Sequence, residues 1–240
     1  MLTNPYSIDV WSIEMAKERM VKGISQEKTA PEWYKKFHIS DHMTLLHLPF
    51  SGIVMAFVVI GATMANEVHI NRLILALMGV FSALQSSHYL DEIKGHPWNT
   101  KISDRLLYLT GFAFLAIGAA IGIYLSLTVS LLIAIFILPA LFFPVAYSLE
   151  LWKDKFHNPL WFGVSWGALT YLGSYFLQSL TINLVAIIMS IAIGIQSAYI
   201  LILYEGTKIE KTRNISWNVL KGTVLLWIFI ALAMLAMKFS

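Results

Sequence analysis

The sequence predicts an all-helical, polytopic membrane bundle of about seven transmembrane helices. Hydrophobic residues make up 58% of its 240 residues and charged residues 13%, whereas a soluble domain is about 45–50% apolar and about 25% charged. The mean hydropathy is +0.68. The apolar residues also form continuous runs close to the ~20 residues that a helix needs to cross a bilayer, not the alternating pattern of a membrane β-strand.

These runs place seven predicted spans within residues 44–240, the predicted helical domain. The spans are 44–66, 72–90, 105–126, 129–150, 160–178, 182–204 and 218–238. Spans three and four are separated at Ser126-Leu-Thr128, because the sequence from Leu106 to Leu149 is otherwise almost continuously apolar. Residues 1–43 form a separate polar segment, in which Ile13–Val21 has the pattern of a short amphipathic helix on the membrane surface.

Lysine and arginine are concentrated on one side of this predicted topology. Fifteen of the 17 precede span one or lie in or beside the loops after spans two, four and six, and only Arg72 and Lys238 lie on the other side. The positive-inside rule therefore predicts a cell-membrane protein with a cytoplasmic N terminus and an external C terminus. This asymmetry accounts for the net charge of +3, so no nucleic-acid partner is expected. The chain has no cysteine, which excludes disulfides, thiolate metal sites and cysteine nucleophiles.

The first candidate site is the exit of span two, where Asp91 and Glu92 precede a Gly/Pro-containing turn. Ionisable groups at a membrane helix end are costly unless they bind something. His88, three residues before Asp91, shares a helix face with it. In the alternative interpretation, the two carboxylates cap and orient the following loop by pairing with Lys94 or Arg105.

Three blocks of the sequence resemble the UbiA superfamily of intramembrane prenyltransferases. The first, Ser86–Ser103, stands where the family has its first aspartate-rich motif. The second, Ala146–Lys153 followed by Gly163–Gly167, is similar to the family's Tyr…Lys loop and Gly-rich span. The third, Ile193–Tyr199 leading to Glu205, stands where the family has its second aspartate motif.

A closer resemblance is to a set of uncharacterised microbial UbiA-like proteins. It is carried by His47-Leu-Pro49 at the start of span one and by the stretch from His88 to Thr100. The order and spacing of all these blocks agree with the family over roughly residues 44–235, so the chain resembles a shortened UbiA-like member.

The resemblance implies a transferase that moves a prenyl group from a prenyl diphosphate to a lipophilic acceptor on the cytoplasmic side, as in lipid or quinone biosynthesis. Asp91 and Glu92 would be catalytic and would hold Mg²⁺ together with Glu205 and His88. Carboxylates suit Mg²⁺, which offsets the charge of the leaving diphosphate. The residues expected to bind the substrate are Lys94, Lys101, Arg105, Tyr147, Lys153, Gln196 and Tyr199.

The sequence also departs from the family pattern. His88, Gly95 and Gln196 stand where the family has acidic residues, and two further spans that the family commonly has are missing. A second hypothesis is therefore a non-catalytic subunit of a membrane complex that retains a degenerate UbiA-like fold. In a haem- or quinone-binding variant of that hypothesis, His47 and His88 would be ligands at similar depth, although haem is not expected.

Overall fold

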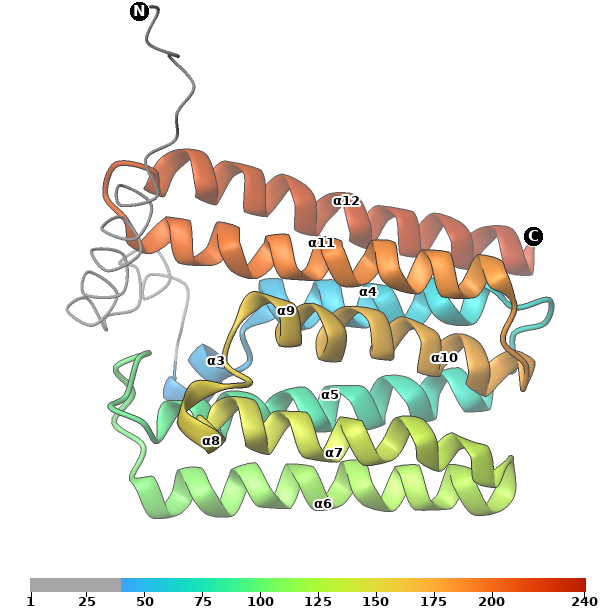
Figure 1. The fold of residues 1–240 in the computed structure, drawn as a ribbon, viewed down its shortest axis with the longest axis horizontal. Coiled ribbons are helices and arrows are strands. Elements are labelled where there is room, and N and C mark those ends of the chain that lie inside the picture. The colour runs from blue at the N-terminus through green and yellow to red at the C-terminus, as the bar shows by residue number, and fades with distance from the viewer. Residues whose placement is uncertain (1–39) are drawn as a thin grey trace, which may run out of the picture.

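The structure, a computed structural model, describes residues 40–240; the predicted surface helix at Ile13–Val21 lies outside this range. Helices account for most of the described chain, and they run side by side along the length of the molecule (Figure 1). The elements are α3 (Asp41–Leu45), α4 (Leu48–Met64), α5 (Ile70–Glu92), α6 (Asp104–Thr128), η1 (Leu131–Ile133), α7 (Ala134–Ser148), α8 (Leu151–Asp154), α9 (Pro159–Phe162), η2 (Gly163–Leu169), α10 (Thr170–Ser179), α11 (Leu184–Lys208) and α12 (Arg213–Phe239).

Five of the helices described in residues 40–240 are long and apolar enough to cross a membrane: α5, α6, η1 with α7, α11 and α12. They correspond to predicted spans two, three, four, six and seven. The division of the long apolar run into two helices is confirmed, but the turn lies at Val129-Ser130. Ser126-Leu-Thr128, the predicted turn, forms the end of α6.

Predicted span one is shorter than expected, because α4 has 17 residues and begins at Leu48 rather than at residue 44. The chain breaks at His47, whose φ of 45° and ψ of 50° lie in the left-handed region. Pro49 follows at the start of α4, where its missing N–H leaves no helical hydrogen bond unmade. The residues before the break form the separate short helix α3.

Side chains of α4 and α5 bind the carbonyl groups that this break exposes. Ser51 and Gln85 donate to the Leu46 carbonyl oxygen, and Nδ1 of His88 lies 3.0 Å from the Leu45 carbonyl oxygen. Backbone carbonyls left without partners in an apolar interior are costly. The polar residues in this part of α5 therefore stabilise the helix break.

Predicted span five is divided into α9, η2 and α10, and η2 is a π-helix. Here Gly163 and Gly167 allow the chain to lie directly against α11. A Cβ at Gly167 would stand only 2.7 Å from the Ser197 Cβ, and one at Gly163 would collide with the Gly194 carbonyl oxygen. The Gly-x-x-x-Gly pair thus packs helices within this chain.

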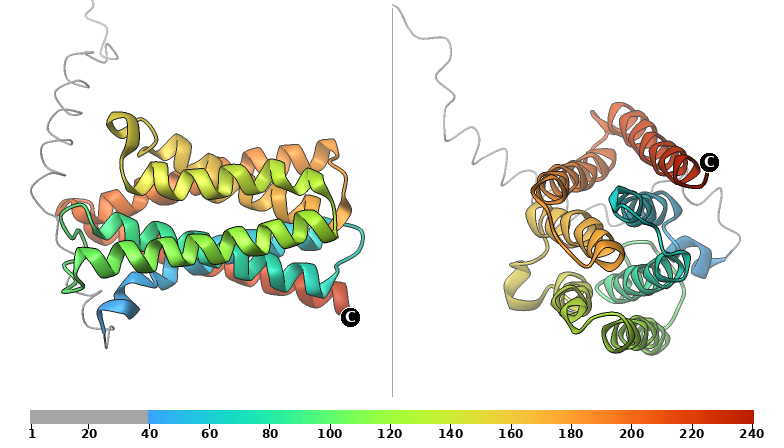
Figure 2. Two further views of the ribbon diagram at one scale, coloured as in Figure 1. Left: turned by 90° about the horizontal axis from the view of Figure 1, so that it is seen from below. Right: turned by 90° about the vertical axis from the view of Figure 1, so that its right-hand side faces the viewer.

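The view along the bundle shows α5 near its centre (Figure 2). Around it lie α4, α6 and α7, and α4 in turn packs between α10 and α12. The outer faces of α6 and α12 expose large apolar side chains such as Leu109 and Phe229. In a membrane protein, such faces suit contact with lipid.

The two ends of the bundle differ in charge. We call the end formed by loops 93–103, 149–158 and 209–212 the basic end, because lysines and arginines gather on it. At the opposite end, Arg72 donates to the Leu177 carbonyl oxygen at 3.2 Å, and Lys238 donates to the Ala65 carbonyl oxygen at 2.7 Å. Both cations there therefore neutralise helix C-terminal carbonyls.

Candidate functional site

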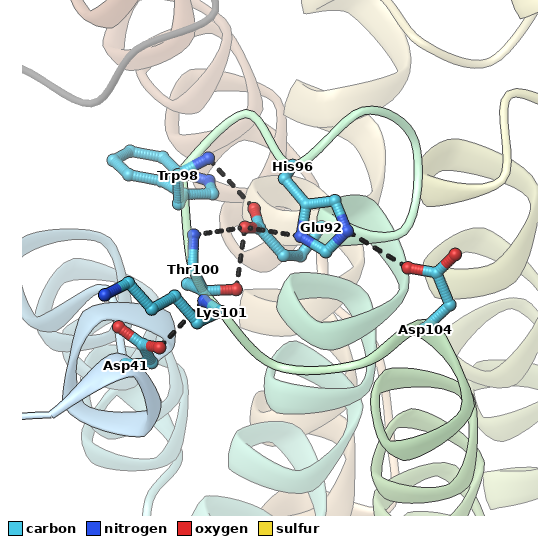
Figure 3. A network of polar contacts seen from close by, with 7 residues as sticks. All are labelled: Asp41, Glu92, His96, Trp98, Thr100, Lys101 and Asp104. Atoms are coloured by element: carbon cyan, nitrogen blue, oxygen red, sulfur yellow. Dashed lines mark hydrogen bonds and ion pairs between the residues drawn. The ribbon is translucent and has the colours of Figure 1, made fainter.

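Glu92 is fully buried at the end of α5, and the loop that follows wraps around its carboxylate (Figure 3). Its Oε2 accepts from the Trp98 N–H at 2.9 Å. Its Oε1 accepts from the Thr100 N–H at 2.9 Å and from the Thr100 hydroxyl at 2.8 Å. His96 adds a contact of 3.4 Å to Oε1. The carboxylate is therefore occupied by its own loop and orients it. The partners expected in the capping interpretation were wrong, since Glu92 is bound by Trp98 and Thr100, and Lys94 pairs with Glu150 instead.

Loop 93–103 needs this support because several of its residues have unusual backbone angles. His96 and Asn99 have φ values of 49° and 57°, in the left-handed region that side-chain-bearing residues rarely adopt. Nε2 of His96 lies 3.0 Å from Oδ1 of Asp104 in α6, and the Lys101 N–H donates to the Asp41 carboxylate of α3 (Figure 3). The Glu92 network thus fixes the loop between two neighbouring helices.

Asp91 has different surroundings from Glu92, because consecutive helical residues point about 100° apart. It is half-buried and interacts electrostatically with His157 and Lys208, which attract its carboxylate, and with Glu150, which repels it. These partners come from the loop after α7 and from the end of α11.

Tyr147, in the last turn of α7, connects Asp91 with Glu205. Its side chain is buried, and both carboxylates interact electrostatically with its phenol. The ring of His157 stacks on it, with centroids 4.2 Å apart and an interplanar angle of 18°. Tyr147 therefore marks the point where the carboxylates of α5 and α11 converge, although 114 residues separate them in the sequence.

Only one of the two oxygens of the Glu205 carboxylate has a partner within residues 40–240. Its Oε1 pairs with Lys208 at 2.8 Å, whereas its Oε2 is buried and has no hydrogen-bond partner within residues 40–240. A buried carboxylate oxygen without a donor is costly. The arrangement at Glu205 is therefore that of a group suited to receive a cation or a donor from a ligand.

The carboxylates fit Mg²⁺ only when another ligand completes the coordination. Within the described part of the chain, no group of three or more His, Asp or Glu side chains is arranged to hold a metal ion. Mg²⁺, however, is usually bound through one or two carboxylates together with substrate phosphates. Asp91 and Glu205 are the two carboxylates that interact with Tyr147, whereas Glu92 and His88 are committed to loop 93–103 and to the helix break.

His47 and His88 do lie at one depth, as expected, but their rings are in direct contact, with centroids 4.3 Å apart. Trp98 packs edge-on against His47 at 3.8 Å. A porphyrin has no space between two rings that touch. In this arrangement the two histidines serve packing and support of the helix break.

The remaining predicted substrate residues are dispersed. Lys94 pairs with Glu150 at 2.8 Å, with both side chains partly exposed. Gln196 is nine residues from Glu205 and so lies on the opposite face of α11, and the Tyr199 side chain is 58% exposed. Lys101, Arg105 and Lys153 are exposed at or near the basic end.

We call the residues that interact around Tyr147 the polar cluster; they are Asp91, Tyr147, His157, Glu205 and Lys208. Two of them were not predicted. Lys208 follows Glu205 by three residues, a spacing that indicates a contact on one helix face. His157 gave no such signal, because it lies in an irregular loop just before the Asn158 cap of α9. Its position beside Tyr147 depends on how loop 149–158 folds back on α7.

An apolar cavity of about 110 Å³ lies between α5, α6, α7, η2 and α10. The hydroxyls in its wall, those of Ser165, Thr170 and Ser174, donate their hydrogens to backbone carbonyls, so only their acceptor lone pairs can face the cavity. Pro144 lines it and lies one helical turn from Tyr147. The cavity is therefore suited to hydrocarbon and begins close to the polar cluster.

No family model, curated protein or solved structure matches this chain.

Proposed function

We propose that this protein is an intramembrane transferase that moves a prenyl group from a prenyl diphosphate to a lipophilic acceptor. The observation that carries the proposal is that Asp91 and Glu205 both interact with Tyr147, which is one helical turn from a residue that lines the apolar cavity. A prenyl diphosphate has the complementary shape, with a charged head at the polar cluster and a hydrocarbon chain in the cavity.

Each group has a role in this proposal. Lys208 would steady the diphosphate, and Tyr147 would form the boundary between the charged head and the chain. Mg²⁺, when bound, would be held by Asp91 and Glu205 and would offset the charge that develops on the leaving diphosphate. Glu92 would act through the loop, by holding residues 93–103 closed over the end of α5.

We further propose that all seven apolar segments span the membrane, with α4 and the α9–η2–α10 segment as the two additional spans, and that the basic end is cytoplasmic. The chain has no native cysteine, so single cysteines report cleanly. Lys211→Cys at the basic end should resist an impermeant thiol reagent added outside cells, and Glu67→Cys at the opposite end should react. The reverse pattern would overturn the orientation.

The function is tested by Asp91→Asn and Glu205→Gln, which keep side-chain shape and remove charge. Each should lower the rate of Mg²⁺-dependent diphosphate release from geranylgeranyl diphosphate by about a thousandfold, because several kcal/mol of leaving-group stabilisation are lost. The assay uses membranes that carry equal amounts of each protein. Glu210→Gln, at an exposed position five residues after Glu205, is the matched control and should keep the wild-type rate.

Equal background release from the wild type and from both variants would contradict the proposal. If the wild type then also co-purified with other membrane proteins in fixed ratio, the non-catalytic subunit would be the better hypothesis.

A further inference from the structure

His157 is held in one orientation by Tyr147. The two rings stack, with centroids 4.2 Å apart, and Nδ1 of His157 lies 3.2 Å from the Tyr147 carbonyl oxygen. Because a carbonyl oxygen can only accept, Nδ1 must carry the hydrogen of this bond. The neutral ring then has its lone pair on Nε2, which has no hydrogen bond within residues 40–240.

The position of this nitrogen suits a proton acceptor. His157 is half-buried at the basic end and interacts electrostatically with Asp91, one of the two carboxylates proposed to hold the head of the substrate. The reacting carbon of a prenyl diphosphate is bonded directly to that head. An acceptor that attacks this carbon must therefore approach the same region of the molecule.

We propose that Nε2 of His157 is the base that removes the acceptor's proton, a step that rests on the proposed function. The allylic C–O bond breaks, and its electron pair leaves with the diphosphate. A new bond forms between the allylic carbon and the acceptor, which is a hydroxyl group or an activated aromatic carbon. The proton that the acceptor loses passes to Nε2 and then from the half-buried ring to water at the basic end.

His157 also supports the end of α7 through its bond to the Tyr147 carbonyl, so the test must separate a base from a structural residue. His157→Asn does so, because an asparagine amide can donate to the same carbonyl but offers no basic nitrogen. His157→Ala removes both functions and leaves space for free imidazole. His69→Asn, at an exposed position at the opposite end, is the matched control.

The probe is radiolabelled geranylgeranyl diphosphate added to membranes that carry each variant. Two products are counted: the free alcohol, formed when water captures the prenyl group, and all prenylated lipids. His157→Asn should keep diphosphate release within about threefold of the wild type, yet lower the ratio of coupled product to alcohol by about a hundredfold, the usual scale of general base catalysis. Imidazole should raise that ratio in His157→Ala, and His69→Asn should behave as the wild type.

An unchanged ratio in His157→Asn, or equal losses of release and coupling without rescue by imidazole, would show that His157 is only structural and overturn the inference. Absence of diphosphate release in the wild type would instead overturn the proposed function, and the assigned base with it.

Discussion

Asp91 and Glu92 are the same kind of group at adjacent positions, yet the fold uses them differently. Glu92 is fully buried and accepts three hydrogen bonds from its own loop. Asp91 is half-buried, and its partners come from distant segments of the chain. A rotation of about 100° along the helix separates a carboxylate held by its own loop from one that faces groups of distant segments. Charge at a membrane helix end therefore does not by itself indicate a site.

The largest expected effect on stability follows from Glu92→Ala. This change leaves the Trp98 and Thr100 donors buried without an acceptor, which should cost about 3 kcal/mol or more. For a protein of this size, the melting temperature in detergent should fall by roughly 6–12 °C. Asp91→Asn should melt within about 2 °C of the wild type, although it should abolish most of the activity. Equal melting losses in both variants would remove the distinction between the two carboxylates.

The smallest effect is expected at the ion pair between Lys94 and Glu150, which joins loop 93–103 to loop 149–158. Both side chains are more than one third exposed, so water screens the interaction. Lys94→Gln and Glu150→Gln should each change stability by less than about 1 kcal/mol, and a double-mutant cycle should give a coupling of similar size. A coupling as large as the loss in Glu92→Ala would mean that the two loops form one unit.

The positions of most long helices were predictable, because a long apolar run in the sequence indicates a helix that can face lipid. The split between α6 and α7 was predicted from Ser126-Leu-Thr128, although the turn itself follows these residues, at Val129-Ser130. The start of α4 was not, because the left-handed conformation of His47 depends on contacts with α5, which a sequence does not display. The π-helix of η2 likewise reflects close packing on α11.

The candidate site was predictable only in part. The sequence identified Asp91, Tyr147 and Glu205, and the fold brings these residues together. It also suggested Glu92, whose loop-capping role depends on donors up to eight residues later in the chain. Gln196 was included because it stood in a motif, but its helix register places it away from Glu205. The resemblance to a family supplies the order of candidate residues along the chain. The helix register decides which of these side chains lie on the same face.

The hydrogen bond from Lys238 to Ala65 has a consequence for synthesis of the chain. It joins the last helix to the end of α4 across 173 residues, and α12 packs along α4. At about 5–20 residues per second, α4 emerges from the ribosome roughly 9–35 s before its partner. During that interval the face of α4 that α12 later occupies is open to lipid, so this helix pair can form only after the rest of the described chain has been made.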